Sequence, residues 1–139
     1  MGAITKVTKR NDSDDSFAVL LVDSTAEEVA QLRKDMPGWL WIEAPEGWPF
    51  NFEARDEDQS LDAIIVFARR DREAQALDVC KHTYQEKMMK GVPLLVAASR
   101  YQMSLAHEVR RLPRGNFIFT PIDEKSLLEK INEIKRAEI

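Results

Sequence analysis

The chain has 139 residues, of which 44% are hydrophobic and 32% charged, and its net charge is −4 at pH 7. This length suits one domain with a core of its own. The negative charge argues against a general nucleic-acid binder, and the uncharged apolar runs, such as 17–22, are too short to cross a bilayer. A single cysteine, Cys80, excludes an internal disulfide. We expect a soluble, cytoplasmic protein that binds neither nucleic acid nor membrane.

The polar and charged composition changes sharply at Phe17. Residues 1–16 (MGAITKVTKRNDSDDS) contain few apolar side chains, as is typical of a mobile terminus. We therefore predict a flexible N-terminal arm over 1–16 and one folded domain over 17–139.

Five short apolar segments are predicted to be strands. Four of them are nearly continuous apolar runs, which is typical of strands buried on both faces of a parallel sheet. The segment WLWIEA alternates and predicts a shorter strand. The predicted strands cover residues 17–23, 39–44, 61–68, 92–98 and 116–120.

Helical patterns follow the first, third, fourth and fifth of these strands. Each pattern opens on a residue that can accept a hydrogen bond from the first helical turn. Residues 45–60 have no such pattern and are predicted to form a long loop. The predicted helix caps are Thr25 with Glu28 as a capping box, Asp71, Ser99 and Asp123.

The alternation of strands and helices predicts an α/β fold with three layers, in which helices cover both faces of a five-stranded parallel sheet. The element count favours the flavodoxin-like, doubly wound strand order 2-1-3-4-5. In such a fold the functional groups are expected at the carboxyl ends of the first and third strands.

Four segments at these strand ends occur in a familiar order. They are LLVDS at 20–24, LDAIIVF at 61–67, VPLLVAAS at 92–99 and FIFTPID at 117–123. With them, the chain from Phe17 to Arg136 resembles a receiver domain of a bacterial two-component response regulator. In receivers, the corresponding segments carry a pair of acids, a phospho-accepting aspartate, a Ser or Thr, and a Lys-Pro dipeptide.

The resemblance implies a degenerate receiver pocket, because most of these functional groups are replaced. Asp23 matches the first acid, but Phe67 stands at the position of the phospho-accepting aspartate. The position of the Ser or Thr falls on Ala98, one residue before Ser99, and Thr120 stands where the lysine would precede the proline. The residues of the degenerate pocket are Asp23, Ser24, Phe67, Ala98, Ser99, Thr120 and Pro121.

A receiver needs a carboxylate nucleophile, a Mg²⁺ ion held by oxygen ligands, and a cation for the phosphoryl charge. Phe67 has no nucleophile, and Asp23 alone does not make a Mg²⁺ site. We therefore predict a pseudo-receiver that is not an enzyme, with no catalytic residue, no metal and no cofactor. An active receiver with Asp71 as a displaced acceptor is the remote alternative.

Asp23 and Ser24 allow two interpretations. Asp23 is either a residual functional acid or a structural residue that caps the first helix or bonds backbone groups at the end of the strand. The helix start at Ser24 could bind an anion, but it lacks glycine, and Glu27 and Glu28 would repel a phosphate.

Aromatic and basic side chains suggest a partner surface. In receivers, the fourth helix, fifth strand and fifth helix form the output and dimer surface, and here arginines and acids share that face. A solvated basic face and a packed aromatic sheet edge at Trp39 and Trp41 are the plainer interpretations. The candidate partner residues are Arg100, Arg110, Arg111, Phe117, Phe119, Glu129 and Trp48.

These observations favour a phosphorylation-independent protein interaction module in bacterial signalling, with an unknown protein partner and a possible homodimer through the fourth helix, fifth strand and fifth helix. The alternative is a small flavodoxin-like enzyme or ligand-binding domain that uses the cleft at the carboxyl ends of strands one and three.

Overall fold

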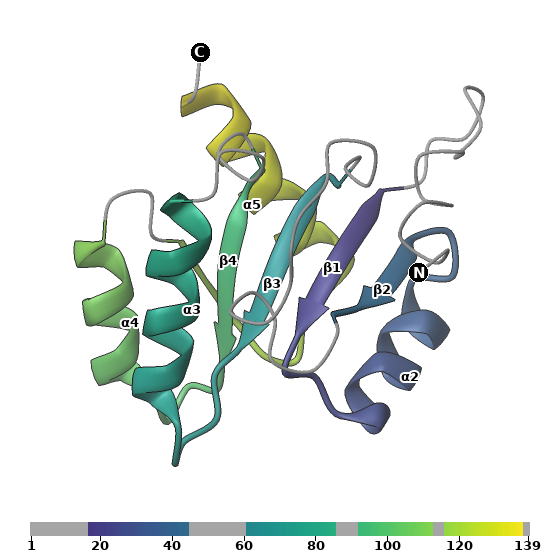
Figure 1. The fold of residues 1–139 in the computed structure, drawn as a ribbon. Helices are drawn as coiled ribbons and strands as arrows, with labels where there is room; N and C mark the ends of the chain where they lie inside the picture. Colours follow the sequence, from purple (N-terminus) through teal and green to yellow (C-terminus); the bar gives the residue numbers. More distant parts are fainter. Residues whose placement is uncertain (1–16, 45–60, 86–91, 113–115, 138–139) are drawn as a thin grey trace.

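The computed structural model describes residues 17–44, 61–85, 92–112 and 116–137 (Figure 1). The predicted arm, the predicted loop and Trp48 lie outside these residues. In chain order, the elements are β1 (Ala18–Val22), α2 (Ala26–Asp35), β2 (Leu40–Glu43), β3 (Ala63–Phe67), α3 (Glu73–Gln85), β4 (Leu94–Ala98), α4 (Met103–Arg111), β5 (Phe117–Phe119) and α5 (Glu124–Ala137).

The strands form a single sheet in the order β2-β1-β3-β4-β5, and every neighbouring pair is parallel. Helices α3 and α4 cover one face, whereas α2 and α5 cover the other (Figure 1). The three-layer, flavodoxin-like prediction is confirmed.

Alternate residues of the central strands feed two separate cores. On β3, Ile64 and Val66 join the core beneath α3 and α4, whereas Ile65 and Phe67 join the core beneath α2 and α5. All five residues of β1, β3 and β4 are buried. Burial on both faces explains why these strands read as continuous apolar runs.

Two predicted helix caps are confirmed. Thr25 Oγ1 accepts a hydrogen bond from the Glu28 amide (3.1 Å), and Glu28 Oε1 accepts one from the Thr25 amide (2.9 Å), which completes the capping box. Asp123 Oδ1 accepts from the Ser126 amide (2.7 Å) at the start of α5.

The other two predicted caps are wrong. Helix α3 begins at Glu73, and the exposed Asp71 lies before it in a turn. Helix α4 begins at Met103, with Gln102 at the N-cap position. Ser99 lies further upstream, and its Oγ accepts from the Tyr101 amide (3.2 Å). The β3–α3 and β4–α4 loops are therefore longer than the sequence pattern indicated.

The tryptophans beside β2 form the packed aromatic edge that the sequence suggested. Trp39 and Trp41 are buried, and their rings stack with centroids 5.4 Å apart and planes 8° apart. Trp39 Nε1 donates to Glu124 Oε2 (2.9 Å), and Trp41 Nε1 donates to the Met36 carbonyl (3.2 Å). These bonds tie the edge of the sheet to α2 and α5.

Cys80 lies in the core beneath α3 and α4, where burial raises the pKa of its thiol to about 12. None of the helices in the described ranges has the length and apolar character needed to span a membrane.

Substitution of Ile65 tests the core directly. Ile65 is completely buried, so Ile65→Ala should lower the free energy of unfolding by about 2–5 kcal/mol. Leu40→Ala on the edge strand, where the side chain is 38% exposed, should cost about 1 kcal/mol or less. Urea titration of both variants measures the difference, and equal losses would contradict the assigned core.

Candidate functional site

The parallel register gathers the predicted pocket at one edge of the sheet. Val22 pairs with Val66, Phe67 with Ala97, and Ala98 with Phe119, so the carboxyl ends of four strands lie side by side. Asp23, Phe67, Ala98 and Thr120 stand at or directly after these ends, with Ser24, Ser99 and Pro121 beside them. The arrowheads in Figure 1 mark this edge.

Phe67 fills the central position of this edge with an apolar ring. Its side chain is 3% exposed and packs in the core beneath α2 and α5. The Ala98 methyl group is buried in the opposite core. The half-buried Thr120 donates its amide to the Ala98 carbonyl (2.9 Å), and the Thr120–Pro121 peptide bond is cis. The ring and methyl groups supply no oxygen ligand or nucleophile.

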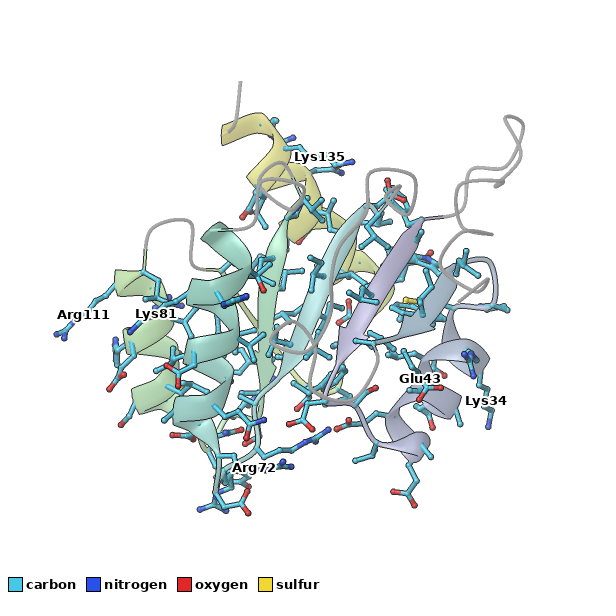
Figure 2. The ribbon with its side chains drawn as sticks, viewed as in Figure 1. Lys34, Glu43, Arg72, Lys81, Arg111 and Lys135 are labelled. Atoms are coloured by element: carbon cyan, nitrogen blue, oxygen red, sulfur yellow. The ribbon has the colours of Figure 1, made fainter. Side chains whose placement is uncertain are left out.

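Asp23 adopts a left-handed backbone conformation with φ at 62°, which aspartate tolerates better than most residues. Its carboxylate lies 3.7 Å from the Arg72 guanidinium, and Figure 2 shows Arg72 at the same edge of the sheet. The hydroxyl of Thr25 caps α2, so the interpretation of Asp23 as the helix cap is wrong.

Arg69 was not among the candidate site residues, yet it makes several contacts at this edge. Its guanidinium donates to both oxygens of Glu28, with Nη1–Oε2 at 2.8 Å and Nη2–Oε1 at 2.6 Å, and also to the Asp23 carbonyl. The same guanidinium lies 5.6 Å from the centroid of the Phe67 ring. Arg69 is therefore bound within the site and is not part of a solvated basic face.

The sequence contained an indirect signal for this pair. Glu28 was assigned to a capping box directly after the first strand, and Arg69 lies directly after the third. Strands one and three are neighbours in the predicted order, so two opposite charges at their carboxyl ends are expected to meet.

The pair changes the protonation equilibria of both partners. Burial by itself raises the pKa of the Glu28 carboxyl. The hydrogen bonds from Arg69 and from the Thr25 backbone together lower this pKa by more than burial raises it, so the pKa lies below its ordinary value. The hydrogen bond to Glu28 raises the pKa of Arg69 against the smaller effect of burial. Both groups are therefore charged at neutral pH.

Gln102 is a second contact residue that the sequence did not indicate. It is 5% exposed, and its Oε1 accepts from the Ser99 amide (2.9 Å) and the Ser99 hydroxyl (3.3 Å). Its Nε2 donates to Glu73 Oε2 (2.9 Å) and to the Ala68 carbonyl (3.4 Å). One buried amide thus joins the ends of β3 and β4 to the starts of α3 and α4.

The described residues line hollows beside this edge. One, of about 290 Å³, lies beside Phe67 between α2 and residues 120–122. Another, of about 830 Å³, lies over β5 between α4 and α5 and includes Arg100, Arg110, Phe117 and Phe119. Among the described residues, no group of three or more histidine, cysteine, aspartate or glutamate side chains is placed to hold a metal ion.

The Arg69–Glu28 pair predicts a specific pH dependence of stability. The pKa of Glu28 is lower in the folded chain than its ordinary value of 4.5, so its contribution is present above that value and is lost as the pH falls through the folded pKa. Glu28→Gln should cost about 1 kcal/mol at neutral pH and less under acid conditions.

Urea unfolding of wild type and Glu28→Gln at neutral and acid pH measures this effect. Glu27→Gln, which removes an exposed carboxylate from the same helical turn, is the matched control. A Glu28→Gln difference that is the same at both pH values would contradict the assignment.

No model of a known protein family matches this chain, and no curated protein matches it. Several solved structures, in contrast, match its fold. The N-terminal receiver domain of a response regulator from Bacteroides fragilis aligns with TM-score 0.65 and 12% identity over 87% of this chain and 98% of that one. The receiver domain of a histidine kinase from Syntrophus aciditrophicus aligns with TM-score 0.60 and 13% identity over 88% and 92%.

A structure described as an adenylate cyclase from Rhodopirellula baltica also aligns, with TM-score 0.61 and 14% identity over 87% of this chain and 88% of that chain. Identities this low establish the fold alone. This chain therefore has the five-stranded α/β fold of response-regulator receiver domains.

Proposed function

We propose that this chain is a pseudo-receiver: a cytoplasmic protein interaction module of bacterial signal transduction that works without phosphorylation. The observation that carries the proposal is the buried Phe67 ring at the phospho-acceptor position, with the Arg69–Glu28 pair beside it. The receiver-like fold supports the signalling role, and the altered edge supports independence from phosphate.

The described residues at the carboxyl edge of the sheet lack the groups that phosphoryl transfer requires. A carboxylate must attack the phosphoryl donor while a divalent cation neutralises charge on the phosphoryl oxygens. Phe67 offers no nucleophile, and the Glu28 oxygens are bound to Arg69. The adenylate cyclase neighbour does not alter this conclusion, because a shared fold does not carry an activity with it.

The ligand-binding alternative has less support. The hollow beside Phe67 is about 290 Å³, at or below the lower end of the range for small-molecule sites. Its lining includes Glu28, which is already paired with Arg69, and it does not include Asp23 or Ser24. The larger hollow over β5 favours a protein partner.

Exposed apolar and basic groups support a partner surface on α4, β5 and α5. Tyr101, in the turn before α4, and Met103, its first residue, are 85% and 46% exposed. The rings of Phe117 and Phe119 meet edge-on at 5.1 Å, but Phe117 is buried, so of the two only Phe119 offers partly exposed surface. Exposed aromatic and arginine side chains are frequent anchors of protein interfaces.

The charges around this hollow fit an acidic partner. Arg100, Arg110 and Lys130 line it, and its one acid, Asp123, caps α5 through Ser126. The homodimer depends on acids of α5 meeting arginines of α4, yet Asp123 and Glu124 already bond within the chain. Glu129 is exposed and keeps the homodimer as the alternative, which a size measurement distinguishes.

Incubation with acetyl phosphate and Mg²⁺ tests the absence of phosphorylation. We expect no acid-labile phosphate on the chain in intact-mass measurements, because Phe67 supplies no carboxylate. A phosphorylatable receiver treated in parallel serves as the control for the donor. Phosphate on an aspartate of this chain would overturn the pseudo-receiver proposal.

Charge reversal tests the partner surface. Arg110→Glu should weaken capture of the partner from native cells by about tenfold, since a central charged contact contributes on the order of 1–2 kcal/mol. Lys34→Glu is the matched control, because both residues are exposed and basic in the last turn of a helix.

Figure 2 shows Lys34 on α2 and Arg111, the neighbour of Arg110, on α4 at opposite sides of the molecule. Equal capture by wild type and both variants would exclude this surface. A dimer that Arg110→Glu dissociates would favour the homodimer over an acidic partner.

A further inference from the structure

Arg69 connects three parts of the carboxyl edge through one side chain. Its guanidinium reaches Glu28 in the first turn of α2, the Asp23 carbonyl directly after β1, and the face of Phe67 at the end of β3. Both members of the ion pair are partly buried, with side-chain exposures of 22% and 31%. A two-point contact between guanidinium and carboxylate is stronger and more directional than a single charged hydrogen bond.

Glu28 has two tasks in this arrangement. The oxygen that accepts the Thr25 amide of the capping box, Oε1, also accepts Arg69 Nη2. The position of the β3–α3 loop is therefore linked to the backbone at the start of α2. The guanidinium of Arg69 places a positive charge among the acids at this edge.

The contacts continue from Arg69 to α4. Ala68, the neighbour of Arg69, donates its amide to the Ala97 carbonyl (2.9 Å), and its own carbonyl accepts from Gln102 Nε2. The Gln102 carbonyl in turn accepts from the Ala106 amide (3.2 Å), in the first turn of α4. Hydrogen bonds, joined by the covalent chain of Ala68, Arg69 and Gln102, thus link α2 through the end of β3 to the start of α4.

We infer that Arg69 is a built-in substitute for a ligand at the carboxyl edge, and that it and Gln102 together fix the start of α4. Arg69 holds the β1–α2 and β3–α3 loops in one arrangement, and Gln102 passes this arrangement to α4, which begins at Met103, and to Tyr101 in the turn before it. The coupling to α4 gives a regulatory role to the proposed partner surface on α4, β5 and α5. This role rests on the proposed function.

Amide hydrogen exchange of Arg69→Gln tests this inference. Loss of the two-point contact should raise exchange rates by roughly fivefold or more in three segments: residues 24–28, residues 68–72 and the first turn of α4. Arg33→Gln is the matched control, because Arg33 also donates to a backbone carbonyl, that of Trp41, and lies near the carboxylate of Glu43. Any increase in amide exchange caused by Arg33→Gln should remain confined to residues near β2.

Two further variants keep the test decisive if Arg69→Gln unfolds. Arg69→Lys retains the charge without the two-point geometry and should give a smaller increase in the same segments. Gln102→Leu should speed exchange in residues 68–72 as well as in α4, because coupling acts in both directions. Unchanged exchange in α4 in Arg69→Lys, together with unchanged exchange at 68–72 in Gln102→Leu, would overturn the inference.

These measurements need neither a partner nor a phosphoryl donor. If α4 does not respond, the coupling is wrong while the absence of phosphorylation stands. If the chain accepts phosphate although α4 does respond, the proposed function is wrong and the coupling stands.

Discussion

The structure of the functional edge depends on the contact between Arg69 and Glu28 above the Phe67 ring. An arginine at the carboxyl ends of parallel strands meets a carboxylate that a helix cap already holds in place. This contact offsets charge and orients two loops without a ligand. The proposed independence from phosphorylation, and with it the proposed role of the domain surface, rests on this arrangement.

The sheet makes this arrangement possible because it is buried on both faces. Side chains alternate between two cores, so Phe67 packs beneath α2 and α5 while Ala98 packs beneath α3 and α4. An apolar side chain at the end of β3 extends the core up to the edge of the sheet. The same rigid layers hold α4 and α5 apart around β5, which leaves the hollow lined by Arg100, Arg110 and Lys130.

Much of the fold was predictable from sequence, whereas the contacts of the edge were not. Apolar runs and their alternation identified the strands and their order, because burial on two faces leaves a plain compositional pattern. The caps at Thr25 and Asp123 followed from local spacing. Asp71 and Ser99 failed because a polar residue before a helix does not reveal how many loop residues intervene. Arg69 and Gln102 were not among the candidate site residues, because Arg69 pairs with Glu28 and Gln102 bonds Ala68 and Glu73, which are distant in sequence.

Titration of Mg²⁺ and beryllofluoride into the isotope-labelled chain, followed by backbone amide NMR, tests the central claim most directly. The account predicts no saturable shift at residues 23, 67, 98 and 120, since the ring and the ion pair leave neither the metal nor the phosphoryl mimic a place to bind. Saturable shifts confined to those four residues would show a working receiver site and contradict the account.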